Sequence, residues 1–303
     1  MRRREFITHL GSCAVAWPLV ARAEQPRKIV KIGYLGPQPD NPMIAASYSV
    51  TASELRKLGF VEGQNLTIAY RHHNVPGADI PKLAAELVQM NVDVLVADGP
   101  EAILQAAVGA TDKIPIAMIA VNFDPIARGY ISGLAHPGRN VTGVFFESIE
   151  LVQKQLDLLK QALPGRDRAA ALYDELSADQ FAAAKQVAET LHLEFLGMKL
   201  ENPPYDFDAA FRLLAQHSPD MLLVLSSAHF TTSAPHLATL AIQQHLPTMF
   251  TFKRYVQAGG LMSYGVDYVD MHRQIASFLD KILNGENPAN IPVEAANEVR
   301  ICD

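Results

Sequence analysis

The sequence has few of the residues that build covalent or metal-bound centres. It contains only two cysteines, Cys13 and Cys302, and one tryptophan, Trp17. Its ten histidines include no pair at the three- or four-residue spacing, with a carboxylate between, that zinc-binding helices use. We therefore expect no metal site, and no intramolecular disulfide if Cys13 is removed with an N-terminal leader.

The sequence also lacks the short motifs of several enzyme classes. There is no G-x-S-x-G nucleophile turn, no G-x-G-x-x-G after a strand and no phosphate-binding loop. No cofactor is expected on this basis. An enzyme stays an open alternative at this point, because active sites are constellations in space and need no local motif.

The first 23 residues have the three parts of a cleavable export signal. Residues 2–4 are arginines that form a positive start, residues 10–21 are mostly apolar, and residues 21–23 (Ala-Arg-Ala) match a cleavage site. The apolar run is well short of the roughly 20 residues that a membrane-spanning helix needs. The pattern predicts a signal peptide over residues 1–23 and a periplasmic protein.

The leader allows two export routes. Residues 3–7 (Arg-Arg-Glu-Phe-Ile) fit a twin-arginine signal, with Thr8 where a lysine is often found. Residues 10–13 offer the second interpretation, a lipoprotein signal with the lipid on Cys13, but the apolar run before that cysteine is short. We favour the twin-arginine route and keep lipidation as the lesser alternative.

Charge argues against one class of partner. Without residues 1–23 the chain carries 22 basic and 31 acidic residues, a formal charge of −9. A chain this acidic has no electrostatic attraction for nucleic acid, so no nucleic-acid partner is expected. The remaining 280 residues are enough for two domains of about 100–200 residues each.

Short apolar runs alternate with amphipathic segments along the rest of the chain. The runs are apolar at consecutive positions, which is typical of parallel strands covered on both faces. Strands are expected at 29–35, 65–71, 92–97, 114–121, 141–146, 168–173, 192–200, 220–225, 247–252 and 259–265. Helices are expected from Pro42 to about Gly59, after Pro81 and Pro100, and at 149–162, 177–191, 206–217, 232–245 and 266–285. We therefore predict an α/β fold with two doubly wound, Rossmann-like lobes and parallel sheets.

The loops that follow the predicted strands are the candidate binding regions. In open α/β sheets, ligands lie outside the carboxyl ends of the strands, where helix N-termini converge. In the first lobe this rule selects Gly36, Pro37, Asp98, Gly99, Asn122, Phe123 and Asp124. In the second lobe it selects Asp174, Ser177, Ser226, Ser227, Phe230 and Tyr255.

Several of these residues suit an amino-acid-like ligand, and each has a structural alternative. Asp124 can bind an ammonium group, or it can cap a helix that begins at Pro125. Ser226 and Ser227 can donate to a carboxylate, or they can cap the next helix, which we favour slightly. Four aromatic residues are candidates for stacking on a ring or for core packing, and packing is favoured for the last of them: Phe123, Phe230, Tyr255 and Tyr264.

Five segments resemble a known family. They are IGYLGP (32–37), LRKLGFVEGQNLTIAYR (55–71), DPIARGYISGLAHPGRNVTGV (124–144), RYVQAGGLMSYG (254–265) and DKILNGENPANIPVE (280–294). Together with the leader, they are similar to ABC-transporter substrate-binding proteins of the tryptophan/tyrosine-type group. The resemblance implies the type I periplasmic-binding-protein fold, in which a multi-crossover hinge joins the two lobes. It also implies a monomeric receptor that passes a small-molecule ligand to an ABC permease and its ATPase.

The family's chain path, applied here, gives expected lobe boundaries. Lobe 1 would comprise residues 28–138 and 259–284, and lobe 2 residues 139–258 and 285–303. The first crossing would lie at about 136–141, in the turn-rich HPGRN segment, and the return near Ala258 and Gly259. Family members usually continue with a strand and a helix, whereas residues 294–303 form a polar tail. We therefore expect a C-terminal truncation, with Cys302 as an accident of it.

Three functions are weighed. The first is a solute receptor of an ABC importer, the second a periplasmic sensor module for a membrane receptor, and the third an α/β enzyme. Asp98 and Glu101 depart from the family pattern, which often has a small hydroxyl residue at the first of these positions. Since the predicted cleft rim is acidic, with Asp124, Asp174 and Glu175 as well, we expect a solute that carries an amine.

Overall fold

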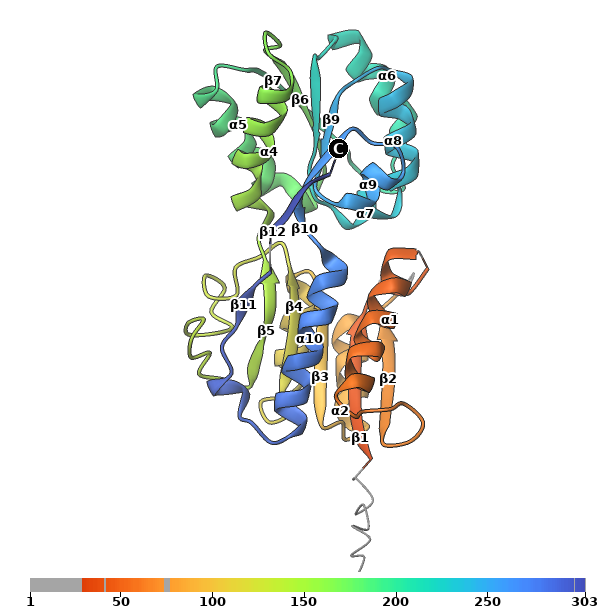
Figure 1. The fold of residues 1–303 in the computed structure, drawn as a ribbon, viewed down its shortest axis with the longest axis vertical. Helices are drawn as coiled ribbons and strands as arrows, with labels where there is room; N and C mark the ends of the chain where they lie inside the picture. Colours follow the sequence, from red (N-terminus) through yellow and green to blue (C-terminus); the bar gives the residue numbers. More distant parts are fainter. Residues whose placement is uncertain (1–28, 41, 74–76, 297, 303) are drawn as a thin grey trace, which may run out of the picture.

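The protein consists of two lobes stacked end to end, each built on one six-stranded sheet (Figure 1). The computed structural model describes residues 29–40, 42–73, 77–296 and 298–302. The predicted signal peptide lies outside the described residues.

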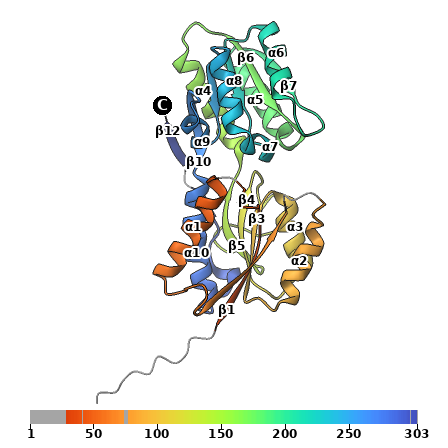
Figure 2. The same ribbon diagram turned by 90° about the vertical axis from the view of Figure 1, so that its right-hand side faces the viewer.

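The first lobe has the strand order β11-β5-β4-β3-β1-β2, and all its pairings are parallel. Its strands are β1 (Val30–Gly36), β2 (Leu66–His72), β3 (Val94–Gly99), β4 (Ile116–Val121), β5 (Val141–Phe146) and β11 (Glu294–Ala295). Its helices are α1 (Pro42–Lys57), α2 (Ile80–Gln89), α3 (Glu101–Ala110), α10 (Tyr268–Leu283) and the short η2 (Pro288–Asn290). Helices α1 and α10 cover one face of the sheet, and α2 and α3 cover the other (Figure 2).

The second lobe has the order β12-β10-β9-β8-β6-β7, in which only β12 is antiparallel to its neighbour. Its strands are β6 (Arg168–Tyr173), β7 (Glu194–Lys199), β8 (Met221–Val224), β9 (Thr248–Phe250), β10 (Met262–Val266) and β12 (Glu298–Cys302). Its helices are α4 (Ser148–Ala162), η1 (Glu175–Ser177), α5 (Ala178–Thr190), α6 (Phe207–His217), α7 (Ala228–Thr232), α8 (Ala234–Gln243) and α9 (Lys253–Gln257). Helices α4 and α5 lie on one face, and α6 and α8 on the other (Figure 1).

The predicted α/β fold with two parallel-sheet lobes is confirmed. The reason is visible in the central strands, because all six residues of β3 are buried and so are five of the six in β4. A strand that is apolar on both faces is stable only where helices cover both sides of the sheet. The sequence pattern and the layer arrangement therefore agree.

Within the described residues the chain crosses between the lobes three times, and all three crossings lie later than the sequence suggested. The first follows β5, which pairs with β4 from Ile116 opposite Val141 to Val121 opposite Phe146. The HPGRN segment (136–140) therefore stays in the first lobe. Because β4 and β5 are parallel, the chain must return along the sheet before β5 begins, and this segment lies at the end of that return. The predicted boundary at residues 138–139 is corrected to the junction of β5 and α4, at residues 146–148.

The return crossing is corrected in the same way. Strand β10 pairs in parallel with β9, so residues 262–266 belong to the second sheet and only α10 belongs to the first lobe. The chain returns at Asp267, between β10 and α10. The third crossing joins β11, beside β5, to β12, beside β10. The predicted boundary at residues 284–285 is therefore corrected too, because η2 and β11 still pack against β5 of the first lobe.

The C-terminal tail forms strands, contrary to the expectation of a polar tail without one. Glu294 and Ala295 pair in parallel with Val144 and Phe145. Residues 298–302 pair antiparallel to β10, with Cys302 opposite Ser263. Backbone pairing along two open sheet edges thus orders a segment whose side chains are mostly polar.

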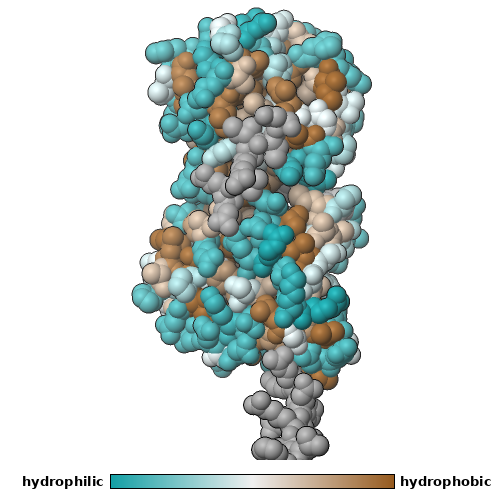
Figure 3. Space-filling model, in the orientation of Figure 1, coloured by the Kyte–Doolittle hydropathy of each residue, from teal (hydrophilic) through white to brown (hydrophobic). Residues whose placement is uncertain are grey.

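One face of the protein is drawn in space-filling form in Figure 3. On the face shown in Figure 3, hydrophilic residues dominate both lobes and the hydrophobic ones form separate patches. None of the helices in the described part of the chain is long and apolar enough to span a membrane.

Candidate functional site

The loops at the carboxyl ends of the two sheets face each other at the waist of the molecule. Strand β5 leads into the second lobe from its carboxyl end, and β10 leads into the first lobe from its own (Figures 1 and 2). All the parallel strands of each sheet point the same way, so their last residues line the region between the lobes. This is where open α/β sheets bind ligands.

A hollow of about 230 Å³ lies at one side of this waist, between residues of both lobes. It is smaller than the roughly 300–1,000 Å³ of pockets for drug-sized ligands, so it suits a small solute. Asn122, Phe123, Asp124, Ala127 and Arg128 line it from the first lobe; Glu147, Ser148, Ile149, Leu176, Asp179 and Gln180 line it from the first crossing and the second lobe.

The charged groups of the hollow are mainly acidic. Three carboxylates, Asp124, Glu147 and Asp179, share it with one guanidinium, that of Arg128. Partial burial raises the pKa of Glu147, and the nearby carboxylates of Asp124 and Glu150 raise it further. Such a cluster costs free energy through like-charge repulsion, and a cation placed in the hollow would relieve it.

The loop after β4 brings three predicted residues into the hollow: Asn122, Phe123 and Asp124. Asp124 caps a turn rather than a helix, because its Oδ1 accepts from the N–H of Ile126 at 2.7 Å and residues 125–129 form turns. Phe123 is buried and packs edge-on against Tyr130 at a centroid distance of 6.1 Å.

Asn122 also ties the lobes together in this conformation. Its Nδ2 donates to Ser226 Oγ in the second lobe at 3.1 Å, and its Oδ1 accepts from Ser148 Oγ at the first crossing. Ser226 is held in turn by Gln180, which accepts from its N–H and donates to its carbonyl, both at 2.9 Å. Asn122 has a φ of 64°, a left-handed conformation that asparagine tolerates better than most residues.

We predict that Asn122→Gly lowers the free energy of unfolding by about 1–2 kcal/mol, the value of two neutral hydrogen bonds. Glycine adopts the left-handed conformation freely, so backbone strain does not contribute to the loss. Asn91→Gly is the matched control, because Asn91 is also left-handed, at φ 51°, but its side chain donates to the nearby Gln89 carbonyl and not to the other lobe. Equal urea-unfolding curves for the two variants would contradict the interlobe role of Asn122.

A second contact between the lobes lies on the other side of the waist. Arg254 of α9 reaches α1, where its Nη1 lies 3.8 Å from Met43 Sδ. Burial lowers the pKa of Arg254, and the carboxylate of Asp40 acts in the opposite direction. Near it, Phe252 packs edge-on against Phe146 at 6.2 Å. These contacts show that α9 is the part of the second lobe that faces α1.

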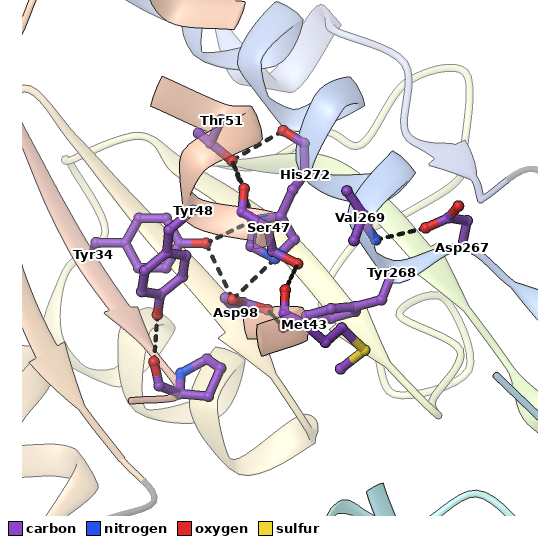
Figure 4. A network of polar contacts seen from close by, with 11 residues as sticks. Tyr34, Met43, Ser47, Tyr48, Thr51, Asp98, Asp267, Tyr268, Val269 and His272 are labelled. Atoms are coloured by element: carbon purple, nitrogen blue, oxygen red, sulfur yellow. Dashed lines mark hydrogen bonds and ion pairs between the residues drawn. The ribbon is translucent and has the colours of Figure 1, made fainter. Parts of the chain in front are cut away.

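The structure places Asp98 inside the first lobe and not on the cleft surface. Its side chain is fully buried, with Oδ1 accepting from the Tyr268 hydroxyl at 2.6 Å and Oδ2 from the Tyr34 hydroxyl at 3.1 Å (Figure 4). Burial raises the pKa of Asp98 to about 7, although the two hydroxyls act to lower it. The adjoining Gly99 has a φ of 146°, and a β-carbon built there would lie 3.0 Å from His73 Nε2.

Gly36 and Pro37 lie at the carboxyl end of β1, in the loop that leads to α1. The Pro37 carbonyl accepts from the Tyr48 hydroxyl at 2.5 Å, and the Gly36 carbonyl accepts from the N–H of His73 at 3.2 Å. A side chain at Gly36 would meet the ring of Tyr34 at 2.6 Å, so the loop needs a glycine there. These two residues therefore shape the cleft floor through their backbone.

In the second lobe, the predicted polar residues form a buried cluster around Asp174. Its carboxylate accepts from Ser177 Oγ at 2.9 Å, from the Tyr205 hydroxyl at 3.2 Å and from Ser227 Oγ. Ser227 also caps α7, accepting from the N–H of His229 at 3.3 Å. The capping interpretation thus holds for Ser227, while Ser226 makes the contact with Asn122.

The two predicted aromatic residues of the second lobe lie in its core. Phe230 has no exposed surface, and Tyr255 is 3% exposed and stacks on Phe250 with ring centroids 4.5 Å apart. Packing, rather than contact with a bound ring, accounts for both in this conformation.

Sequence reasoning missed most of the hollow, because only Asn122, Phe123 and Asp124 of its lining were predicted, and Arg128 was not. Glu147 and Ser148 were overlooked because the first crossing was placed too early, and Asp179 and Gln180 because they follow the loop at 174–177 by one helical turn. Ligands bind outside the carboxyl ends of parallel strands, and this rule, applied to β5 as well as to β4, would have selected Glu147 and Ser148. The structure shows no cluster of three metal-ligating residues in the ranges it describes.

The fold and the cleft match a known family. The family model for ABC transporter substrate binding proteins matches residues 40–302. The chain belongs to this family. The resemblance seen in the sequence is thereby confirmed, and the chain is a solute-binding protein of an ABC transporter rather than an enzyme.

Individual relatives agree with this assignment. The tyrosine-binding protein of Clostridioides difficile (strain R20291) is 25% identical over 251 residues, which cover 82% of this chain and 71% of that protein. A conserved domain protein from Vibrio cholerae O1 biovar El Tor has a crystal structure that matches with a TM-score of 0.79 and 25% identity, over 90% of this chain and 91% of that one. An ABC domain from Streptococcus pneumoniae in complex with L-Trp shares the fold, with a TM-score of 0.77 and 22% identity over 90% of each chain.

As a member of this family, the substrate-binding protein acts outside the cytoplasm and binds a small solute. A sensor role is the weaker alternative, since the family is that of transporter receptors.

Proposed function

We propose that this substrate-binding protein is exported through the twin-arginine route to the periplasm, binds an amino-acid-like solute with a free amine, and delivers it to an ABC permease and its ATPase. The observation that carries the ligand class is the hollow between the lobes, with its three carboxylates and one guanidinium. The names of the relatives support it, because one is called a tyrosine-binding protein and another was solved with L-Trp.

The two ends of a zwitterion have complementary partners in the hollow. Glu147 and Asp179 come from the second-lobe side and Asp124 from the first, so an ammonium between them would bond to both lobes. Arg128 can receive the carboxylate as a bidentate pair. It lies 3.3 Å from Glu101, so the ligand would compete with that ion pair.

Contact with both lobes also supplies the mechanism. A ligand shifts a conformational equilibrium only by its difference in affinity for the two states. An amine held by carboxylates of both lobes binds more tightly when the lobes approach each other, so it favours the closed form. The three crossings, between β5 and α4, between β10 and α10 and between β11 and β12, act as the hinge.

A thermal-shift screen tests the ligand class. We expect one or more amino acids, with aromatic ones foremost, to raise the melting temperature, because a ligand that binds only the folded state stabilises it. Aromatic amines without a carboxylate should give smaller shifts, and dicarboxylates none. If dicarboxylates alone raised the melting temperature, the assignment of an amine-bearing solute would be wrong.

A further inference from the structure

The buried polar cluster of the first lobe is used neither by the hollow nor by the interlobe contacts. It joins four elements: Asp98 lies on β3, Tyr34 on β1, Thr51 on α1, and Tyr268 and His272 on α10 (Figure 4). Asp98 and His272 are both fully buried, and Asp98 Oδ2 lies 3.5 Å from His272 Nε2. Buried carboxylates normally have a cation or a proton, since an unpaired buried charge is costly.

Among the described residues, no lysine or arginine forms an ion pair with Asp98. The titratable groups facing Asp98 are Tyr34 from β1, Tyr48 from α1, and Tyr268 and His272 from α10. The side chain of His73, after β2, meets the Asp98 backbone. The tyrosine hydroxyls stay protonated, because burial and the charge of Asp98 raise the pKa of both Tyr34 and Tyr268.

The hydrogen-bond geometry indicates where a proton is needed. Thr51 Oγ1 lies 3.0 Å from the His272 carbonyl and 3.3 Å from the Ser47 carbonyl, and donation to either leaves it free to accept from His272 Nδ1 at 3.1 Å. The Tyr34 hydroxyl donates to Asp98 Oδ2 and lies 3.4 Å from the same nitrogen, so it too can accept from Nδ1. With its proton on Nδ1, neutral His272 presents the lone pair of Nε2 toward Asp98, and Nε2 has no hydrogen-bond partner. One added proton between Nε2 and Oδ2 would pair the nitrogen and neutralise the carboxylate.

We propose that Asp98 and His272 share one proton beyond those of a carboxylate and a neutral imidazole, and that this proton fixes α10 against β3. The position of α10 makes the contact important. Its cap, Asp267, is the residue at which the chain returns from the second lobe, and Tyr268 follows directly. The proton therefore holds the helix that starts at the second crossing.

The same cluster reaches the cleft floor of the first lobe. Asp98 directly precedes the Gly99 loop, and Tyr48, which packs edge-on against Tyr34 at 4.9 Å, bonds the Pro37 carbonyl. Two cleft loops and one crossing thus share a single buried network. Loss of the proton would loosen all three together.

The pH dependence follows from the two groups. The pKa of Asp98 is raised from 3.8 to about 7, so its contribution to stability is lost as pH rises between these values. Burial lowers the pKa of His272 from 6.5 to about 3, so its contribution has the opposite sign over that interval. The contributions of Asp98 and His272 to the free energy of unfolding offset each other between about pH 4 and 6.5. Above that range only the decrease in stability due to Asp98 remains.

Nitrogen NMR of the wild-type protein tests the shared proton directly. With ¹⁵N-labelled histidine, and His272 assigned by its loss in His272→Gln, we expect a protonated Nδ1 and an Nε2 signal that shifts with a midpoint of about pH 7. A proton on Nε2 alone, with no shift between pH 6 and 8, would overturn the proposal.

Variants test the link to stability. Asp98→Asn keeps acceptors and donors in the cluster but does not titrate, so its urea midpoint should not fall between pH 6.5 and 8, whereas the wild-type midpoint should. Tyr268→Phe removes a hydrogen bond that lowers the Asp98 pKa, so the fall should move to higher pH. Asp206→Asn, at the exposed cap of α6, should behave as wild type. A wild-type midpoint that does not change over this range, or changes equally in Asp98→Asn, would refute the coupling.

Discussion

Replacing Gly143 with alanine is expected to lower the free energy of unfolding by about 3–5 kcal/mol, among the largest effects of a single methyl group. Gly143 lies in the middle of β5, opposite Met118 of β4. A β-carbon built there would be 2.2 Å from the Met118 carbonyl oxygen and 2.7 Å from its nitrogen. The φ of Gly143 is 137°, which alanine adopts only under strain.

The control for this variant is Gly109→Ala, in the exposed part of α3. A β-carbon at Gly109 would have no atom within 4 Å, so alanine there should stabilise the helix by up to about 1 kcal/mol. Urea unfolding of both variants measures the difference. If Gly143→Ala lost less than about 1 kcal/mol, then β5 would not pack against β4 as described.

The second lobe repeats this arrangement. Gly265 lies on β10, and a β-carbon there would be 2.1 Å from the Thr251 carbonyl oxygen. Both glycines occupy the last parallel strand before a crossing, β5 in one lobe and β10 in the other. Close approach of backbone to backbone therefore fixes each strand that leads into the hinge.

The second large effect concerns the ligand. We expect Glu147→Gln to weaken the binding of an amino-acid ligand by about 10- to 100-fold, because a hydrogen bond between charged groups is worth about 1.5–3 kcal/mol. Glu147 is central to this prediction since it lies at the first crossing, between Asp124 and Asp179 in the hollow. Isothermal titration calorimetry with the amino acid that gives the largest thermal shift measures the loss.

Two comparisons make this result specific. Asp112→Asn removes an exposed carboxylate that does not line the hollow, and it should leave the affinity unchanged. The raised pKa of Glu147 means that it gains its proton at a higher pH than an ordinary glutamate, so wild-type affinity should fall as the pH is lowered. Unchanged affinity in Glu147→Gln would show that the amine lies elsewhere in the cleft.

The fold was predictable from sequence because the strands are apolar at consecutive positions, but the lobe boundaries were not. Residues 141–146 and 262–266 would have the same apolar pattern whether they paired with the sheet of the first lobe or with that of the second. The turn residues of 136–140 suggested a crossing, yet parallel pairing only requires that the chain return to the start of β5. Pairing partners, which single-sequence patterns do not contain, decided both cases.

The site was predictable where one loop supplies it and not where distant segments meet. Asn122, Phe123 and Asp124 follow β4 and came directly from the rule of carboxyl ends. Asp98 also ends a strand, but β3 is buried on both faces, so nothing in the sequence shows that its carboxylate turns toward α10. The contribution of α10 to that cluster comes from about 170 residues further along the chain, at Tyr268.

The central claim is that a small solute binds between the lobes and draws them together. Small-angle X-ray scattering tests it most directly, with and without the amino acid that gives the largest thermal shift, at a concentration that calorimetry shows to be saturating. The account predicts a smaller radius of gyration with the ligand bound, and recovery of the larger value after dialysis. Saturating binding with an unchanged radius of gyration would contradict it.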